Sequence, residues 1–141
     1  MKYQQWESAA DIENEQGVAS CIERAFQCQL HKLPKSYRLD FMATREGDGV
    51  AWIEVKCRKH ASTKYSTVML SLSKVLAARE LESITDCKAY LVVRFTDCIK
   101  YVPFSAAHSC KWGGRTKNTR DSRDIEPVLH FTTQEMETLK P

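Results

Sequence analysis

The sequence predicts one mixed α/β domain over residues 1–141, in which helices flank a central sheet. The length of 141 residues suits a single domain with its own buried core. Segments with helical spacing of apolar residues alternate with short segments rich in β-branched and aromatic residues. Hydrophobic residues make up 43% and charged residues 28%, with five glycines and four prolines. This composition excludes a collagen-like or low-complexity chain and argues against wholesale disorder.

The first expected element is a helix over residues 7–30. One face of this helix is marked by residues that recur every three or four positions: Ala9, Ile12, Gln16, Ala19, Ile22, Ala25 or Phe26, and Leu30. Gly17 weakens the helix by about 1 kcal/mol relative to alanine. Pro34 prevents the helix from continuing past the segment that follows it.

A β-hairpin is expected next, formed by strands over residues 37–43 and 50–57. Apolar and polar residues alternate partly in the first run and more clearly in the second. Between them, residues 45–49 contain two glycines and an Asp-Gly step, which is the composition of a tight turn.

The middle of the chain predicts a loop, a helix and a second pair of strands. Residues 58–66 are polar and basic, and a helix follows over residues 67–83. The apolar stripe of this helix consists of Val68, Leu72, Val75, Leu76 and Leu81. Residues 88–96 and 99–104 are β-prone runs that a short turn connects.

The C-terminal part predicts mostly irregular structure. Residues 105–124 are rich in Gly, Ser, Thr, Arg and Lys, which is typical of a loop. Residues 125–131 predict a short edge strand, because Pro127 argues against a central one. Thr132 or Thr133 is expected to cap a last short helix. The expected element order is therefore α-β-β-α-β-β.

Nothing in the sequence predicts a membrane segment or a leader. The longest apolar run, residues 89–93, has the length of a strand, whereas a membrane helix needs about 18–20 apolar residues. The first residues contain no apolar h-region, so no secretory signal is expected. The six cysteines form no CxxC pair. We therefore expect reduced thiols and a cytoplasmic protein.

The cysteines are expected to pack and not to ligate. Cys21 and Cys28 lie seven residues apart on one face of the first helix, as small buried hydrophobes. Cys57 is expected to point away from Lys56, into the core. Cys98, His108 and Cys110 lack the spacing of a closed zinc site, so no zinc is expected.

Three charged residues of the hairpin form a chemically distinctive set. Asp40 lies in the first strand, and Glu54 and Lys56 lie in the second. Because side chains alternate faces along a strand, Glu54 and Lys56 point to the same side. A hairpin centred on residues 46–48 places Asp40 opposite residues 53–55, so that Asp40 and Glu54 come within reach of one cation.

Apolar neighbours suggest that both carboxylates are withdrawn from water. Leu39 and Phe41 flank Asp40, and Ile53 and Val55 flank Glu54. Burying two carboxylates side by side is costly unless a cation holds them. Mg²⁺ typically binds one or two carboxylates together with waters and phosphate oxygens. A nearby lysine can orient or deprotonate an attacking water, or neutralise phosphate charge.

This pattern, Asp40 followed after a hairpin by Glu54-Val55-Lys56 and preceded by an acidic helix, resembles the PD-(D/E)xK nuclease superfamily. The layout looks most like its small Holliday-junction resolvases and phage-type nucleases. The resemblance covers about residues 11–104 and departs from the motif in one place, because Leu39 replaces the proline before the aspartate. It implies a restriction-endonuclease-like αβββαβ core over about residues 7–104, with residues 105–141 as a basic loop and C-terminal extension.

The resemblance implies a metal-dependent endodeoxyribonuclease that hydrolyses phosphodiester bonds. Asp40, Glu54 and the Val55 carbonyl would bind Mg²⁺ or Mn²⁺. Glu15 on the first helix, or Glu23 as the alternative, would hold a second metal or a water. Lys56 would assist the attacking water, whose pKa the metal lowers.

A further polar residue is expected on the helix after the Glu-x-Lys strand. Lys74 is the candidate that the resemblance favours, and Ser71 and Ser73 are the alternatives.

Two basic segments, each with an aromatic residue, are expected to contact nucleic acid. The residues are Arg58, Lys59, Lys64 and Tyr65 in the first, and Lys111, Trp112, Arg115, Lys117, Arg120 and Arg123 in the second. Flexible basic loops suit phosphate contacts, and aromatic rings suit base stacking. The net charge of +3 therefore averages an acidic first helix and two basic segments.

Two other functions remain compatible with the same residues. The domain could be a non-catalytic nucleic-acid-binding module on the same fold. It could also be a structural or assembly protein in which Asp40, Glu54 and Lys56 form an ion-pair network. The expected partner is DNA and not a membrane. If the substrate is a four-way junction, two active sites are needed and a homodimer follows.

Overall fold

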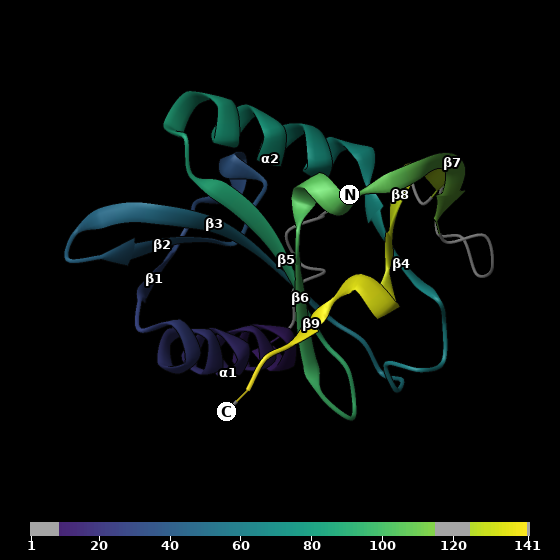
Figure 1. The fold of residues 1–141 in the computed structure, drawn as a ribbon, viewed down its shortest axis with the longest axis horizontal. Coiled ribbons are helices and arrows are strands. Elements are labelled where there is room, and N and C mark those ends of the chain that lie inside the picture. The colour runs from purple at the N-terminus through teal and green to yellow at the C-terminus, as the bar shows by residue number, and fades with distance from the viewer. Residues whose placement is uncertain (1–8, 115–124, 141) are drawn as a thin grey trace.

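The computed structural model describes residues 9–114 and 125–140, which form two helices and two sheets (Figure 1). The helices are α1 (Ala9–Phe26) and α2 (Leu72–Thr85). The larger sheet consists of β1 (Gln29–Lys32), β2 (Phe41–Arg45), β3 (Asp48–Cys57), β5 (Lys88–Arg94), β6 (Ile99–Pro103) and β9 (Glu137–Thr138). The smaller sheet consists of β4 (Thr67–Ser71), β7 (His108–Gly114) and β8 (Ile125–Thr132). Short 3-10 turns occupy Lys35–Tyr37, Phe104–Ala106 and Thr133–Glu135.

The larger sheet is mixed, with strand order β1-β2-β3-β5-β6-β9. Strands β3 and β5 are parallel, and the other neighbours are antiparallel. The chain returns from β3 to β5 through β4 and α2, because a parallel pair needs a long crossover. Apart from β4, which belongs to the smaller sheet, the order α1-β1-β2-β3-α2-β5 is the expected αβββαβ core. The expected α/β class with a central mixed sheet is confirmed.

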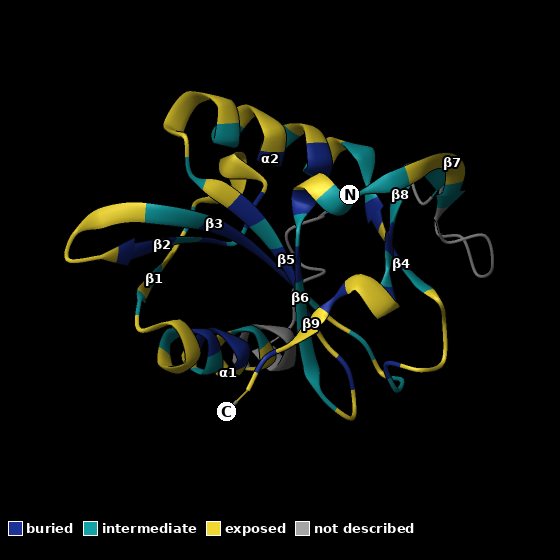
Figure 2. Cartoon of the chain, in the orientation of Figure 1, coloured by how far each residue is buried: buried dark blue, intermediate teal, exposed yellow. Residues whose placement is uncertain are grey.

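The two helices cover opposite faces of the larger sheet, and the smaller sheet stands beside α2 (Figure 1). Strand β3 contributes alternate residues to the two buried layers. Ile53 and Val55 belong to the cluster under α1, and Trp52 belongs to the cluster under α2. Buried residues accordingly occupy the sheet-facing sides of the helices (Figure 2). Strand β3 is thus buried on both faces near its carboxyl end.

The first helix is shorter than expected and is followed by an additional strand. It ends at Phe26 and not at residue 30, because Gln27 adopts a left-handed conformation with φ 51°. The next residues pair with β2 as edge strand β1 instead of completing the apolar face of a helix. Cys28 consequently lies outside the helix that was expected to contain it.

The hairpin turn is tighter than the expected residues 45–49. Glu46 and Gly47 both have positive φ, 52° and 86°, which is the conformation that lets a two-residue turn follow the twist of a hairpin. Strand β2 begins only at Phe41, because a 3-10 turn and a bend occupy residues 35–40.

The second helix begins later than expected. Residues 67–71 form β4, in which Val68 and Leu70 are buried while Met69 is exposed, a period of two and not of 3.6. Ser71 then caps α2, since its side chain accepts a hydrogen bond from the Ser73 backbone N–H.

The expected loop over residues 105–124 is partly a strand, since His108–Gly114 forms β7. Strand β8 is the central strand of the small sheet and not an edge strand, with β4 on one side and β7 on the other. Pro127 is tolerated because β4 pairs only with residues 128–132, so that β8 has a single neighbour at Pro127. The last short helix is a 3-10 turn after Thr132, whose side chain makes no capping bond.

The six cysteines lie within the described residues and form no disulfide. Cys57 is exposed at the end of β3, which corrects the expectation that it enters the core. In the described ranges, no helix has both the length and the apolar character needed to cross a membrane.

Candidate active site

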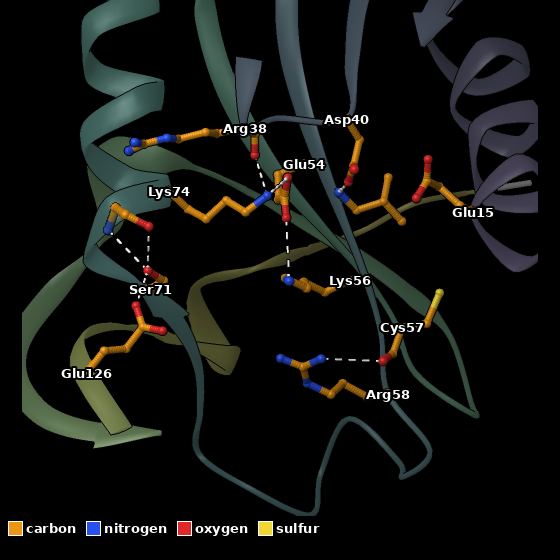
Figure 3. Close-up of polar contacts among 12 residues, drawn as sticks. Glu15, Arg38, Asp40, Glu54, Lys56, Cys57, Arg58, Ser71, Lys74 and Glu126 are labelled. Carbon is orange, nitrogen blue, oxygen red and sulfur yellow. Dashed lines mark hydrogen bonds and ion pairs between the residues drawn. The ribbon is translucent and has the colours of Figure 1, made fainter. Parts of the chain in front are cut away.

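The carboxyl end of β3 brings a buried carboxylate next to two lysines. The side chain of Glu54 is only 2% exposed, and its two oxygens lie 3.4 Å from Lys74 Nζ and 3.5 Å from Lys56 Nζ (Figure 3). Glu54 and Lys56 point to the same side of β3, as their spacing predicts. Lys74 comes from α2, which packs over this side of the sheet.

Asp40 lies opposite residues 53–55 as expected, although it precedes β2 and is not part of that strand. Its backbone N–H donates to the Ile53 carbonyl at 3.1 Å, and its own carbonyl accepts from the Leu33 N–H at 2.8 Å. Asp40 Oδ2 accepts a 2.7 Å hydrogen bond from the Val55 N–H. These three bonds fix the Asp40 carboxylate beside the strand that carries Glu54 (Figure 3).

Burial and the nearby negative charge both penalise the ionised form of Glu54. Desolvation, followed by the charge of Asp40, raises the pKa of Glu54 from its ordinary 4.5 to about 7. Lys74 and Lys56 oppose this shift and do not cancel it. The two lysines therefore do not fully compensate the cost of ionising the Glu54 carboxylate in this buried position.

A third carboxylate reaches the same region from α1. Glu15 is bonded to Lys32 of β1, and Lys32 Nζ also lies 3.5 Å from Asp40 Oδ1. Glu23, the alternative to Glu15, instead accepts a 2.9 Å hydrogen bond from the Leu30 N–H and ties α1 to β1. Of the two glutamates, Glu15 is the one beside Asp40.

These groups line one cleft of about 450 Å³, rich in positive charge. Its lining residues are Glu15, Lys32, Leu33, Lys35, Arg38, Leu39, Asp40, Glu54, Val55, Lys56, Cys57, Arg58 and Lys74. Six of them are basic and three are acidic. The cleft thus combines a small acidic centre with a basic surround, which suits a polyanion whose phosphate meets a cation bound by the carboxylates.

Lys74 is positioned by two acceptors. Its Nζ donates to the Arg38 carbonyl as well as to Glu54. The alternatives to Lys74 have other contacts: Ser71 caps α2 through the Ser73 N–H and also donates to Glu126 of β8. Neither Ser71 nor Ser73 lines the cleft.

The chemistry of the donor set fits a hard divalent cation. Among the described residues, no group of three or more His, Cys, Asp or Glu side chains converges as a complete ligand cage. Mg²⁺ does not need one, because it typically takes one or two carboxylates and completes its shell with water and phosphate oxygens. Asp40 and Glu54 supply two carboxylates. Val55 directly follows Glu54, and its N–H is bonded to Asp40, so its carbonyl belongs to the same stretch of backbone.

The expected nucleic-acid contacts are distributed over two surfaces. Arg58 lines the cleft, and burial lowers its pKa. Lys59, Lys64 and Tyr65 are exposed on the loop after β3. Lys111 and Trp112 are exposed on β7, with Trp112 at 73%. The remaining candidates, Arg115, Lys117, Arg120 and Arg123, lie outside the described residues.

Sequence reasoning missed three basic residues of the cleft: Lys32, Lys35 and Arg38. A signal was present, because these cations fall within the eight residues immediately before Asp40. Their placement depends on β1 and on the 3-10 turn after it, neither of which was expected.

The hairpin aspartate, the Glu-x-Lys strand and the helix glutamate, arranged on an αβββαβ core, define a PD-(D/E)xK nuclease fold. The chain belongs to the family described as "Phage putative PDDEXK endonuclease", which matches residues 1–139. A comparison with curated proteins finds no similar sequence.

A solved structure shares the fold. Hjc, a Holliday junction resolvase from the archaeal hyperthermophile Archaeoglobus fulgidus, superposes with a TM-score of 0.62 at 15% sequence identity. The match covers 89% of this chain and 88% of that chain. At this level of identity the likeness establishes a common fold.

The raised pKa of Glu54 predicts a pH-dependent stability in metal-free buffer. Between pH 4.5 and about 7 the folded protein binds more protons than the unfolded chain, so stability falls as the pH rises through this window. The full effect is about 3 kcal/mol. Glu54→Gln removes it, so the free energy of unfolding of the variant rises relative to wild type by about that amount from pH 4.5 to 7.5.

Urea denaturation in EDTA at several pH values measures this difference. A difference between the two proteins that stays constant with pH would contradict the account of Glu54.

Proposed function

We propose that this protein is a divalent-metal-dependent DNA endonuclease that hydrolyses phosphodiester bonds, with Mg²⁺ or Mn²⁺ as its cofactor. The observation that carries the proposal is the buried Glu54 carboxylate beside Asp40 in a basic cleft. A purely structural ion pair needs no such excess of buried negative charge at one point. The family membership supports the reaction class.

Each residue of the cleft has a role in this proposal. Asp40, Glu54 and the Val55 carbonyl would hold the ion. When bound, the ion lowers the pKa of the attacking water and stabilises charge on the phosphate. Lys56, held by its ion pair with Glu54, would orient that water and, through its Nζ ammonium, offset negative charge on the phosphate.

Two further groups maintain the geometry around this centre. Lys74 Nζ donates hydrogen bonds to Glu54 Oε1 and to the Arg38 carbonyl. These two bonds fix the Glu54 carboxylate between α2 and the sheet. Glu15, bonded to Lys32, holds a water or a second cation next to Asp40. In this proposal Lys32 also limits the negative charge on Glu15 and Asp40 before a cation binds.

We extend the proposal to branched DNA as the substrate, as in a Holliday junction resolvase. The shared fold with a resolvase supports this choice. Trp112, which is 73% exposed and neighbours Lys111, suits stacking on a base pair left open at a branch point. Arg58, Lys59 and Lys64 suit the phosphate backbone on the side of the cleft.

Substitutions in the acidic centre test the proposal. Glu54→Gln and Asp40→Asn are expected to lower Mn²⁺- or Mg²⁺-dependent cleavage of junction DNA by at least about 100-fold, because even indirect disturbance of a metal site costs about 10–100-fold. Lys56→Met is expected to lower the rate by about 100-fold, because it removes the positive charge that orients the water and offsets charge on the phosphate. Glu23→Gln is the matched control and retains wild-type activity, since Glu23 lies outside the cleft.

Gel assays of labelled junction, duplex and single-stranded DNA, with and without Mn²⁺, measure these effects. Full activity in Glu54→Gln or Asp40→Asn would reject the catalytic assignment. Salt-sensitive binding without cleavage by the wild type would support the binding-module alternative, and no DNA affinity at low salt would support the structural one.

Cleavage of both strands of a junction requires two active sites, so we propose a homodimer. A groove between the 3-10 turn at 35–37 and α2, which carries exposed apolar side chains, supports a docking face for the second copy. Tyr37, Leu76 and Ile84 of this groove are 45%, 58% and 74% exposed. Arg38 lines both this groove and the catalytic cleft, so a dimer formed here keeps the two cleavage sites close to its interface.

The double variant Leu76→Asp, Ile84→Asp tests the dimer. Two charges in an apolar interface are expected to convert the dimer to a monomer and to abolish paired cleavage of the junction. Met69→Asp, on β4 and 42% exposed, is the control and stays dimeric. Light scattering after gel filtration gives the mass. A wild type that is monomeric with and without junction DNA would contradict the proposal.

A further inference from the structure

The loop that follows the Glu-x-Lys strand is basic and held in place. This basic loop, residues 58–66, contains Arg58, Lys59 and Lys64 and no acidic residue. Backbone hydrogen bonds secure its two ends: the Arg58 N–H donates to the Arg94 carbonyl at 2.8 Å, and the Thr133 N–H donates to the Ser66 carbonyl at 2.9 Å. One end of the segment is therefore tied to β5 and the other to the 3-10 turn at Thr133–Glu135.

A side chain from elsewhere in the fold holds the middle of the basic loop. Asp97, in the turn between β5 and β6, accepts two hydrogen bonds from Ser62, one from the backbone N–H and one from the hydroxyl, each of 2.8 Å. Ser62 is only 7% exposed. The Thr96 N–H also donates a 3.0 Å hydrogen bond to the His60 carbonyl. The turn between β5 and β6 therefore bonds to the basic loop at two positions, His60 and Ser62.

The anchored loop presents its cations outward. The His60 ring packs edge-on against Tyr65, with centroids 4.9 Å apart, and also contacts Phe95 at 5.8 Å. Lys59 and Lys64 are exposed, and Lys64 Nζ lies 5.4 Å from the centroid of the Tyr65 ring. Because the basic loop directly continues β3, these cations stand at a fixed position relative to Glu54 and Lys56.

The negative charge of Asp97 cannot by itself favour DNA binding. A carboxylate beside a basic loop repels a polyanion, so charge alone would make this residue unfavourable for DNA binding. Its two oxygens, however, both serve Ser62, and these bonds lower the pKa of the Asp97 carboxyl. This conflict between charge and geometry makes the two roles separable by experiment.

We propose that Asp97 is a positioning residue for the DNA substrate: by anchoring Ser62 it preorganises the basic loop, so that Lys59 and Lys64 meet the phosphate backbone in one arrangement next to the cleft. The inference rests on the proposed function, because it takes DNA as the substrate. Asp97 lies far from Asp40 in the sequence and does not line the cleft. In this proposal Asp97 affects the affinity for the substrate and not the rate of the chemical step.

The variant Asp97→Ala tests the proposal through the sign of its effect. If the carboxylate acts only as a charge, its removal tightens DNA binding. If it anchors the loop, the dissociation constant for junction DNA rises about tenfold, as expected when one or two loop side chains must be ordered on binding. The slope of log affinity against log salt concentration also becomes less negative, by the amount that corresponds to the loss of about two phosphate contacts.

Two matched variants complete the design. Asp97→Asn removes the same charge but keeps an oxygen that can accept from the Ser62 N–H, so its affinity is expected to stay within about twofold of wild type. Ser62→Ala keeps the charge and loses only the hydroxyl bond, so it is expected to weaken binding by about threefold. These two variants retain the test if Asp97→Ala does not fold.

Fluorescence anisotropy with labelled junction DNA in EDTA, from 25 to 200 mM NaCl, gives the affinities, and single-turnover cleavage at saturating protein gives the chemical rate. The proposal expects a changed affinity with an unchanged rate. Equal or tighter binding by Asp97→Ala and Ser62→Ala, or a loss of rate at saturation, would overturn it. A wild type that does not bind DNA at low salt would instead reject the proposed function.

Discussion

The carboxylate of Glu54 is removed from water, and Asp40 adds a second negative charge beside it. This concentration of buried charge is the constraint on which the rest of the cleft depends. Lysines from three different elements surround it: Lys32 from β1, Lys56 from β3 and Lys74 from α2. They reduce the electrostatic cost without removing it, since the pKa of Glu54 still rises to about 7. A bound divalent cation would remove the remainder.

The fold supplies this geometry through one strand. The apolar residues of β3 that flank Glu54 anchor the cluster under α1, while Glu54 itself faces α2. The hairpin with β2 then brings Asp40 onto the Val55 N–H, and the continuation of β3 becomes the basic loop. The acidic centre, Lys56 and the basic loop are thus arranged along a single stretch of backbone. In the proposed function, this arrangement would hold a phosphate between them with little freedom to move.

The central part of the site could be predicted because it is local. Asp40, Glu54 and Lys56 belong to one hairpin, whose turn composition and alternation fix their relative positions. The cations before Asp40 are visible in the sequence, but the position of Lys32 in the cleft could not be predicted. It depends on β1, an edge strand that begins within the segment expected to end the first helix. The same limit explains β4 and β7. Val68 fits the apolar stripe of a helix that continues through Leu72, and it also fits a strand; only pairing with β8 decides between them.

The central claim is that Asp40 and Glu54 form a divalent-cation site, and calorimetric titration of the DNA-free protein with Mn²⁺ at pH 8 tests it most directly. The account predicts saturable binding by the wild type and by Glu23→Gln, and loss of at least about tenfold in affinity in Asp40→Asn and in Glu54→Gln, as expected when a metal site is disturbed. Mn²⁺ binding of equal affinity in wild type and Glu54→Gln, or no binding by the wild type, would contradict it.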